Sequence, residues 1–227
     1  MLDSPEEFAA LAMSLTQEPD VEQTVESIAE FAKLGLDCEF AGVHIKHQRR
    51  VETAAASDPL ISRADQLQTE TGEGPCLDAV WEHDTFVVKD TATDPRWPTF
   101  GPMAAELGLH SVLSIRLSDT EQTLGALNLY STRVREFDDD DIAVAHIFGR
   151  HASVALSAAR REENLLNAID ARHLIGLAQG ILMERYDLSA DKAFAVLRRY
   201  SQDNNIKLRD VADQIINTKE LPKHPLS

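Results

Sequence analysis

Apolar residues follow two different periods along the first part of this chain. Residues 5–34 repeat apolar positions every three or four residues, which predicts an amphipathic helix, and Pro19-Asp20 is expected to interrupt it. From Cys38 onward the pattern shortens to runs typical of strands, expected at 40–45, 51–56, 85–88, 111–117 and 123–130. Short helices are expected between them, at 59–67, 75–83 and 99–107. Hairpins mixed with helices are typical of an α+β fold, here an antiparallel sheet with flanking helices.

The strand pattern ends at Phe137, and a long helical pattern follows. No proline occurs between Asp138 and Tyr186, so one continuous helix is expected over this range. The acidic run 138–141 is expected at its N-terminus, where carboxylates complement the helix dipole; a cation site is the alternative. An apolar stripe runs from Val144 to Ala158. A small domain leaves such a stripe without a partner, so we predict that it pairs with the N-terminal helix and with a second subunit.

Three shorter helical patterns fill residues 171–221. Their apolar faces are Ala171, Leu174, Ile175, Ala178, Ile181 and Leu182; then Ala190, Ala193, Phe194 and Leu197; then Leu208, Val211, Ala212, Ile215 and Ile216. Ser189 is a suitable N-cap for the second helix. Short loops between helices of this length predict a compact three-helix unit.

Charge divides the chain at the same place as the helical pattern. The chain has 227 residues and a formal net charge of −16. Residues 1–159 carry a net charge of −17, whereas residues 160–227 carry 11 basic and 10 acidic side chains. A polyanion is therefore a poor partner for the first part, and the two parts are expected to have different roles.

The sequence shows no sign of export or membrane insertion. The acidic N-terminus lacks the basic region and apolar core of a signal peptide, and no run approaches the roughly 20 apolar residues that a membrane helix needs. The two cysteines, Cys38 and Cys76, are too few for a disulfide framework. We therefore expect a cytoplasmic protein with reduced thiols and no membrane partner.

Four segments of the C-terminal part resemble the ANTAR domain, the RNA-binding output module of transcription antitermination regulators. They are Arg172-His-Leu-Ile-Gly-Leu-Ala-Gln-Gly-Ile-Leu-Met-Glu-Arg185, Ser189-Ala-Asp-Lys-Ala-Phe194, Leu197-Arg-Arg-Tyr-Ser201 and Lys207-Leu-Arg-Asp-Val-Ala212. The first part is similar to a GAF domain, a sensor fold for small molecules. That resemblance rests on Gly72-Glu-Gly-Pro-Cys-Leu77, Leu124-Gly-Ala-Leu-Asn-Leu129 and Phe137-Asp-Asp-Asp-Asp-Ile142.

Together the two resemblances imply a domain arrangement. We expect a GAF-like sensor at 1–158, a helical connector at 159–170, an ANTAR-like domain at 171–221 and a tail at 222–227. The ANTAR resemblance implies a homodimer, formed here through the connector and the N-terminal helix. Its two output units would each bind one loop of a paired RNA hairpin, which prevents a terminator from forming.

Loop recognition in RNA needs cations, a flat ring and close approach of the backbone. The residues expected to contact RNA are Arg172, Gly176, Gln179, Gly180, Tyr200, Ser201, Lys207 and Arg209. The family usually has lysine where this chain has Gln179, and glutamine neutralises no phosphate. Gly176 and Gly180 could instead permit tight packing between helices, and Tyr200 could belong to the edge of the core. Without RNA binding, the output unit would be a protein-interaction module.

The sensor part carries no recognisable catalytic motif, so we do not expect an enzyme. Cys76 is expected near a helix N-terminus, a position that favours a reactive thiol and leaves a redox sensor as an alternative function. With Trp81, Trp97 and Phe100 it could line a ligand pocket, although all of these are also ordinary core residues. No cofactor or metal is identifiable, and the small ligand of the sensor is unknown from the sequence.

Overall fold

The computed structural model describes residues 10–221, apart from residues 12, 37, 49, 83, 135 and 136. The predicted tail at 222–227 and the start of the predicted N-terminal helix lie outside the described residues. The chain forms two compact units, Met1–Arg161 and Glu162–Ser227.

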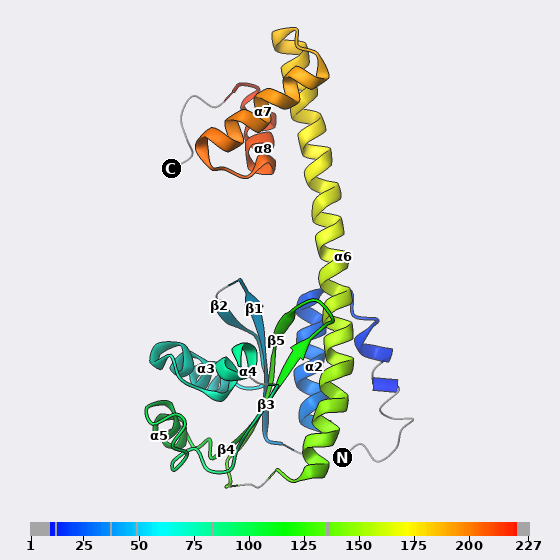
Figure 1. Cartoon of the computed structure of the whole chain (residues 1–227). Helices are drawn as coiled ribbons and strands as arrows, with labels where there is room; N and C mark the ends of the chain where they lie inside the picture. Colours follow the sequence, from blue (N-terminus) through cyan, green and yellow to red (C-terminus); the bar gives the residue numbers. More distant parts are fainter. Residues whose placement is uncertain are drawn as a thin grey trace. The chain divides into compact units, whose positions relative to one another are not determined.

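A five-stranded antiparallel sheet forms the centre of the first unit (Figure 1). Its strands are β1 (Phe40–His47), β2 (Arg50–Ala56), β3 (Thr85–Val88), β4 (Ser111–Ser118) and β5 (Thr123–Ser131). Their order is β2-β1-β5-β4-β3, so β2 and β3 are the edge strands. All five strands were predicted, with ends within two residues, and the α+β class is confirmed.

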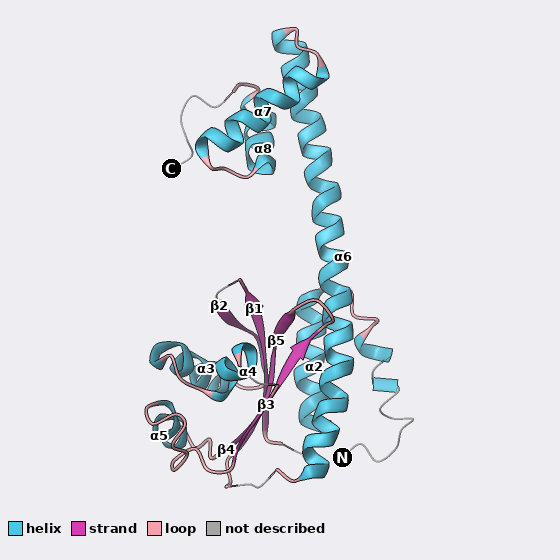
Figure 2. Ribbon diagram, viewed as in Figure 1, coloured by secondary structure: helices cyan, strands magenta, loops and turns pink. Residues whose placement is uncertain are grey.

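Helices cover both faces of the sheet, as Figure 2 shows. One face carries α2 (Val21–Gly35) and the first part of α6 (Asp139–Tyr186). The other face carries α3 (Pro59–Thr71), α4 (Pro75–Trp81) and α5 (Phe100–Glu106). Successive side chains along a strand point to opposite faces of the sheet, so each strand contributes to two separate cores.

Local capping residues explain where these helices begin and end. Asp20 accepts a hydrogen bond from the Gln23 amide and starts α2 directly after the predicted break at Pro19. Asp58 caps α3 in the same way and is followed by a proline in the first turn. Gly72 ends α3 with φ of 69°, a left-handed conformation that glycine adopts without strain.

The helix α6 is continuous from Asp139 to Tyr186, as predicted, and passes from the first unit into the second. Asp138 and Asp141 cap its N-terminus reciprocally, with the Asp141 amide 2.8 Å from Asp138 Oδ1. The acidic run thus serves the helix end, and no cluster of potential metal ligands occurs among the described residues.

The hairpin between β4 and β5 is attached to α6 by side-chain hydrogen bonds. Ser157 donates to Asp119 Oδ2 at 2.8 Å, and Ser153 accepts from the Ser118 amide at 3.0 Å. Arg161 lies 3.8 Å from the Asp119 carboxylate. These contacts fix α6 to the sensor sheet close to the end of the first unit.

The predicted apolar stripe on α6 is divided between two environments. Phe148, Ala152 and Ala155 are buried in the core on the sheet, so the prediction that the stripe lacks a partner within one domain is wrong for them. Ile147 and Val154 lie on another side of the helix and remain 50% and 64% exposed. The prediction assumed that other elements cover the sheet. In the structure, α6 itself covers one face of the sheet together with α2.

In length and composition, α6 is also the one helix in the described part of the chain that could cross a membrane. Its most apolar 18-residue window is 44% buried inside the structure. A core helix passes the same test, so this is weak evidence for a membrane span.

The second unit packs the end of α6 against α7 (Ala190–Asn204) and α8 (Leu208–Thr218). Among the described residues of this unit, the fully buried ones are all apolar: Ala178, Leu182, Ala193, Leu197, Val211, Ala212 and Ile215. Each had been placed on an apolar helical face, and the predicted three-helix unit is present. Asn205, in the left-handed region at φ 53°, ends α7 and allows the tight turn into α8.

Candidate functional site

Two glycines lie on an open face of α6 in the second unit. Gly176 and Gly180 are exposed, and a Cβ added at either position would meet no atom within 4 Å. Arg172, one turn before Gly176, is exposed, as is Met183. Packing between helices of this unit therefore does not explain the glycines, which leave bare backbone on the surface.

Gln179 does not lie fully on this open face, contrary to the prediction. It is half-buried, and its amide Nε2 donates to the carbonyl oxygen of Ala190 at 3.3 Å. The first turn of α7 approaches this side of α6, which the spacing along α6 alone could not show. Gln179 therefore connects two helices and borders the glycine face.

Tyr200 and Ser201 have structural contacts at the end of α7. Tyr200 is half-buried against the apolar core of the unit, and its carbonyl accepts from the Asn204 side chain at 2.9 Å. The hydroxyl of Ser201 donates to the carbonyl of Ile206 at 2.6 Å and closes the turn between α7 and α8. Tyr200 therefore lies at the edge of the core, as the alternative interpretation predicted.

Lys207 and Arg209 are exposed at the start of α8. Lys207 occupies the N-cap position, where its carbonyl accepts from the Asp210 and Val211 amides. Arg209 lines a groove of about 570 Å³ between α6 and α8, together with Leu174. The eight predicted residues thus fall into an α6 group and a group around the turn between α7 and α8.

In the sensor unit, the predicted motif Gly72-Glu-Gly-Pro-Cys-Leu77 joins three helices. Glu73 accepts hydrogen bonds from the Thr99 and Phe100 amides, at 2.8 and 3.1 Å, and from the Thr99 hydroxyl. These bonds hold the pKa of Glu73 below its usual value. Gly74 has φ of 145°, and a Cβ there would meet Gln68. The motif therefore positions Cys76 in the first turn of α4.

Of the four residues predicted to line a ligand pocket, Cys76 lines a cavity between described residues of the sensor unit. Trp97 and Phe100 are buried in the core, where the indole N–H of Trp97 donates to Asp78 at 2.7 Å. Trp81 is 47% exposed, and the Lys46 ammonium lies 4.3 Å from its ring centroid. These three rings are not among the described residues that line the cavity next to Cys76.

That cavity has a volume of about 300 Å³ and lies where α3 and α4 meet β1 and β2. A network of buried polar side chains borders it. His44 Nε2 lies 2.8 Å from Asp65 Oδ2, and His44 Nδ1 lies 2.6 Å from the Asn128 side-chain nitrogen. Asp65 also accepts from Thr53 at 2.9 Å and from the Tyr130 hydroxyl at 3.2 Å.

Burial and charge act against each other in this network. Burial lowers the pKa of His44, but the charge of Asp65 and the neighbouring Cys76 side chain raise it well above the usual value. Burial raises the pKa of Tyr130, and the charge of Asp65 raises it further. This network was not predicted from the sequence, because His44, Asp65 and Asn128 are single polar residues far apart in the chain.

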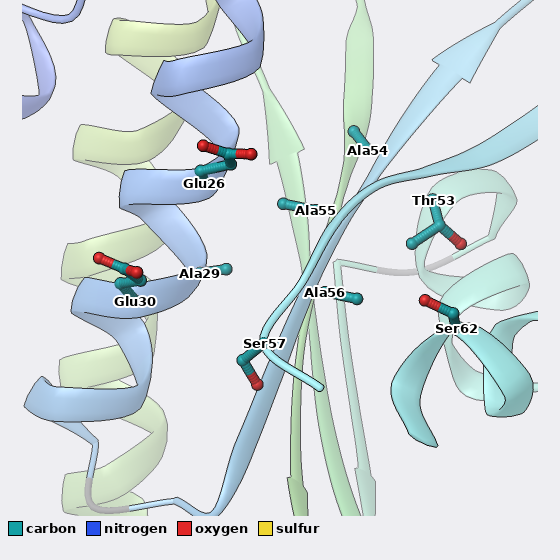
Figure 3. A pocket seen from close by; sticks show the side chains of 9 residues that line it. All are labelled: Glu26, Ala29, Glu30, Thr53, Ala54, Ala55, Ala56, Ser57 and Ser62. Atoms are coloured by element: carbon teal, nitrogen blue, oxygen red, sulfur yellow. The ribbon is translucent and has the colours of Figure 1, made fainter. Parts of the chain in front are cut away.

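A second groove of about 550 Å³ follows the free edge of β2 (Figure 3). Glu26 and Glu30 of α2 line one side, and Ser62 of α3 lines the other. Alanines 54 to 56 form the strand between them. Charged side chains beside an edge strand commonly prevent pairing with other chains.

Comparisons with known proteins agree with this arrangement. A family model of the GAF domain matches residues 18–157, and one of the ANTAR domain matches residues 163–216. No curated protein matches the chain.

Solved structures resemble the sensor part at low identity. Free methionine-R-sulfoxide reductase from Neisseria meningitidis is 19% identical to this chain, with a TM-score of 0.55. The matched region covers 68% of this chain and 88% of the reductase chain. The GAF domain of a phosphoenolpyruvate-protein phosphotransferase from Coxiella burnetii is 16% identical, with a TM-score of 0.53. The matched region covers 69% of this chain and 96% of that domain. These likenesses show the fold alone. The chain belongs to the GAF domain family and joins this sensor domain to an ANTAR domain, an RNA-binding output domain of antitermination regulators.

Proposed function

We propose that this chain is a cytoplasmic transcription antitermination regulator that acts as a homodimer. In this proposal the two output units of the dimer each bind one loop of a paired RNA hairpin. The GAF unit responds to a signal and controls whether the output units can bind together. The family matches support the two domain types, and the residues described above support the finer steps.

The observation that carries the RNA proposal is the pair of open glycines on α6. Glycine inside a helix costs about 1 kcal/mol relative to alanine, and no neighbour within the unit requires it here. A backbone surface without Cβ atoms lets another molecule approach closely. Arg172 beside this surface supplies a cation for a phosphate group.

Charge distribution supports the same assignment. The output part has balanced charge, and Lys207 and Arg209 are exposed at the start of α8. The sensor part carries a net charge of −17, which opposes contact with RNA. RNA is therefore expected to bind through the output unit alone.

Exposed apolar side chains on α6 support the dimer. Ile147 and Val154 lie seven residues apart on one side of the helix, which is the repeat of a coiled-coil seam. Leu165, Leu166 and Ile169 continue as exposed apolar residues further along α6. We propose that the same helix of a second subunit covers them, with the N-terminal helix beside it.

We also propose that the chain is a regulator and not an enzyme. The polar groups of the sensor cavity are bonded largely to one another, as His44, Asp65 and Tyr130 show. A change in this network, caused by a bound ligand or by modification of a side chain, would alter the packing of the helices and strands around the cavity.

Gel-shift titration of the full chain with a two-hairpin RNA tests the proposal. We expect binding to require both loops, so deletion of one loop should weaken it by at least about tenfold. Arg172→Ala should weaken binding, whereas Arg199→Ala, which removes an exposed arginine paired with Asp203 on α7, serves as the matched control. Binding that ignores the loops, or no binding at all, would favour a protein-interaction module.

A further inference from the structure

The thiol of Cys76 lies in a chemical setting that the other cysteine lacks. Cys76 occupies the first turn of α4 and lines the 300 Å³ cavity together with His44. His44 is in turn paired with Asp65 at 2.8 Å, and both side chains are only 4% exposed. A thiol beside an imidazole that a carboxylate orients is the arrangement that activates cysteine as a nucleophile.

A second feature of the cavity, the side chain of Gln68, indicates that a hydrogen-bond acceptor could be accommodated there. Gln68 is 2% exposed and lines the cavity beside Cys76, whose amide donates to Gln68 Oε1 at 3.0 Å. The other end of the same side chain, Nε2, is buried and makes no well-formed hydrogen bond. A buried donor without an acceptor costs about 1–3 kcal/mol, so an acceptor arriving at this point would be stabilised.

We propose that Cys76 is a modification site of the sensor domain, at which a hydroperoxide oxidises the thiol to a sulfenic acid. The cavity admits a molecule as small as hydrogen peroxide, although the residue itself is buried. His44 positions the thiol and supplies a proton, and Gln68 Nε2 donates to the new oxygen.

The step balances in atoms and electrons. The Cys76 thiol loses its proton to solvent, from which His44 is later reprotonated, and the thiolate sulfur attacks one peroxide oxygen. The O–O bond breaks and hydroxide leaves, taking a proton from the His44 imidazolium to form water. Sulfur is oxidised to S–OH, and the peroxide is reduced to water. A low-molecular-weight thiol reverses the change by forming and then exchanging a mixed disulfide.

Cys38 provides an internal control in the same unit. It is also buried, but its thiol donates to the carbonyl oxygen of Phe40 at 3.5 Å and lines none of the cavities described. Neither cysteine forms a disulfide. A difference in reactivity between the two therefore measures the effect of the His44 network and the cavity.

The test treats the full chain with hydrogen peroxide and a dimedone probe, and measures labelling of each cysteine by peptide mass spectrometry over time. We expect Cys76 to be labelled at least about tenfold faster than Cys38 in the folded protein. In urea the two rates should converge. Cys38→Ser should leave the Cys76 rate unchanged, and Cys76→Ser should remove the fast reaction.

His44→Gln separates activation from mere access to the cavity. Glutamine can still bond Asp65 but cannot transfer a proton, so a folded variant should react at least about tenfold more slowly. Equal rates for Cys76 and Cys38 in the wild-type chain would overturn the proposal whatever the folding of the variant. An unchanged rate in folded His44→Gln would overturn it as well.

Discussion

The two units of this chain treat polar side chains in opposite ways. In the sensor unit, His44, Asp65, Asn128 and Tyr130 are buried between the sheet and its helices and bond to one another. In the described part of the output unit every fully buried side chain is apolar, and the polar residues are exposed or half-buried. Hydrogen bonds between buried polar side chains are therefore part of the folded core in the sensor, whereas the core of the output unit forms mainly from apolar contacts.

This difference predicts how mutations will divide between the units. A buried charge that loses its partner destabilises the fold strongly, whereas a surface change away from special features usually moves stability by less than about 0.5 kcal/mol. Polar substitutions in the sensor should therefore alter stability first. Polar substitutions in the output unit should alter binding first.

The largest effect is expected for Asp65→Ala. It removes the partner of His44 and the acceptor for Thr53 and Tyr130, so it should lower the free energy of unfolding of the sensor by about 3–5 kcal/mol. Urea titration followed by near-UV circular dichroism measures this. Asp213→Ala, an exposed aspartate of α8, is the control in the output unit and should change little. A loss below about 1 kcal/mol for Asp65→Ala would remove the contrast between the units.

A pH titration of stability should show the same buried network. The pKa of His44 is raised in the folded state, so its contribution is complete below about pH 6.5 and is lost as the pH rises through the folded value. The slope can reach about 1.4 kcal/mol per pH unit for this single proton. Urea unfolding at a series of pH values from 6 to 9 measures it, and His44→Gln should flatten the curve. A sensor that gains stability over this range would contradict the assignment.

Gly176→Ala and Gly180→Ala should separate stability from binding in the output unit. Each should raise the stability of that unit by about 1 kcal/mol, because alanine favours helix and the added methyl meets no neighbour. Each should also weaken RNA binding, because the methyl group blocks close approach of the backbone. Thermal unfolding and gel shift measure the two effects. Asn167→Ala, at an exposed position of the same helix, should stabilise without weakening binding.

Gln179→Lys is expected to give the smallest effect, visible mainly as salt dependence. A lysine here borders the glycine face and adds one cation per subunit, so the slope of log affinity against log salt should steepen by about 1 to 2 units in the dimer. The 3.3 Å bond to Ala190 is long, so its loss should cost little stability. An unchanged slope, together with a silent Arg209→Ala, would indicate that this surface does not contact RNA.

Much of the fold followed from the sequence because strong local signals mark the elements. The strand patterns before residue 131 lie between clear turn residues, and the structure has all five strands. The absence of proline between Asp138 and Tyr186 predicted a single helix, and α6 is one. The change in charge near residue 160 lies close to the boundary between the two compact units, after Arg161.

The candidate sites were less accessible to sequence reasoning, for a physical reason. His44 and Asn128 are 84 positions apart and meet only because β1 pairs with β5. A single polar residue in an apolar strand gives no signal of a network. Gln179 was misplaced because its environment depends on the angle at which α7 crosses α6, which the period of one helix does not encode.

Residues 162–170 of α6 are all exposed within the folded chain. A helical segment without tertiary contacts is held mainly by its neighbours along the chain, since short isolated helices are marginal in water. Its amide hydrogens should therefore exchange with solvent faster than those of the buried parts of α6, and a protease should cut there first. Pairing with a second helix would slow both processes. Exchange rates at these amides thus give a local measure of assembly that needs neither RNA nor the signal of the sensor.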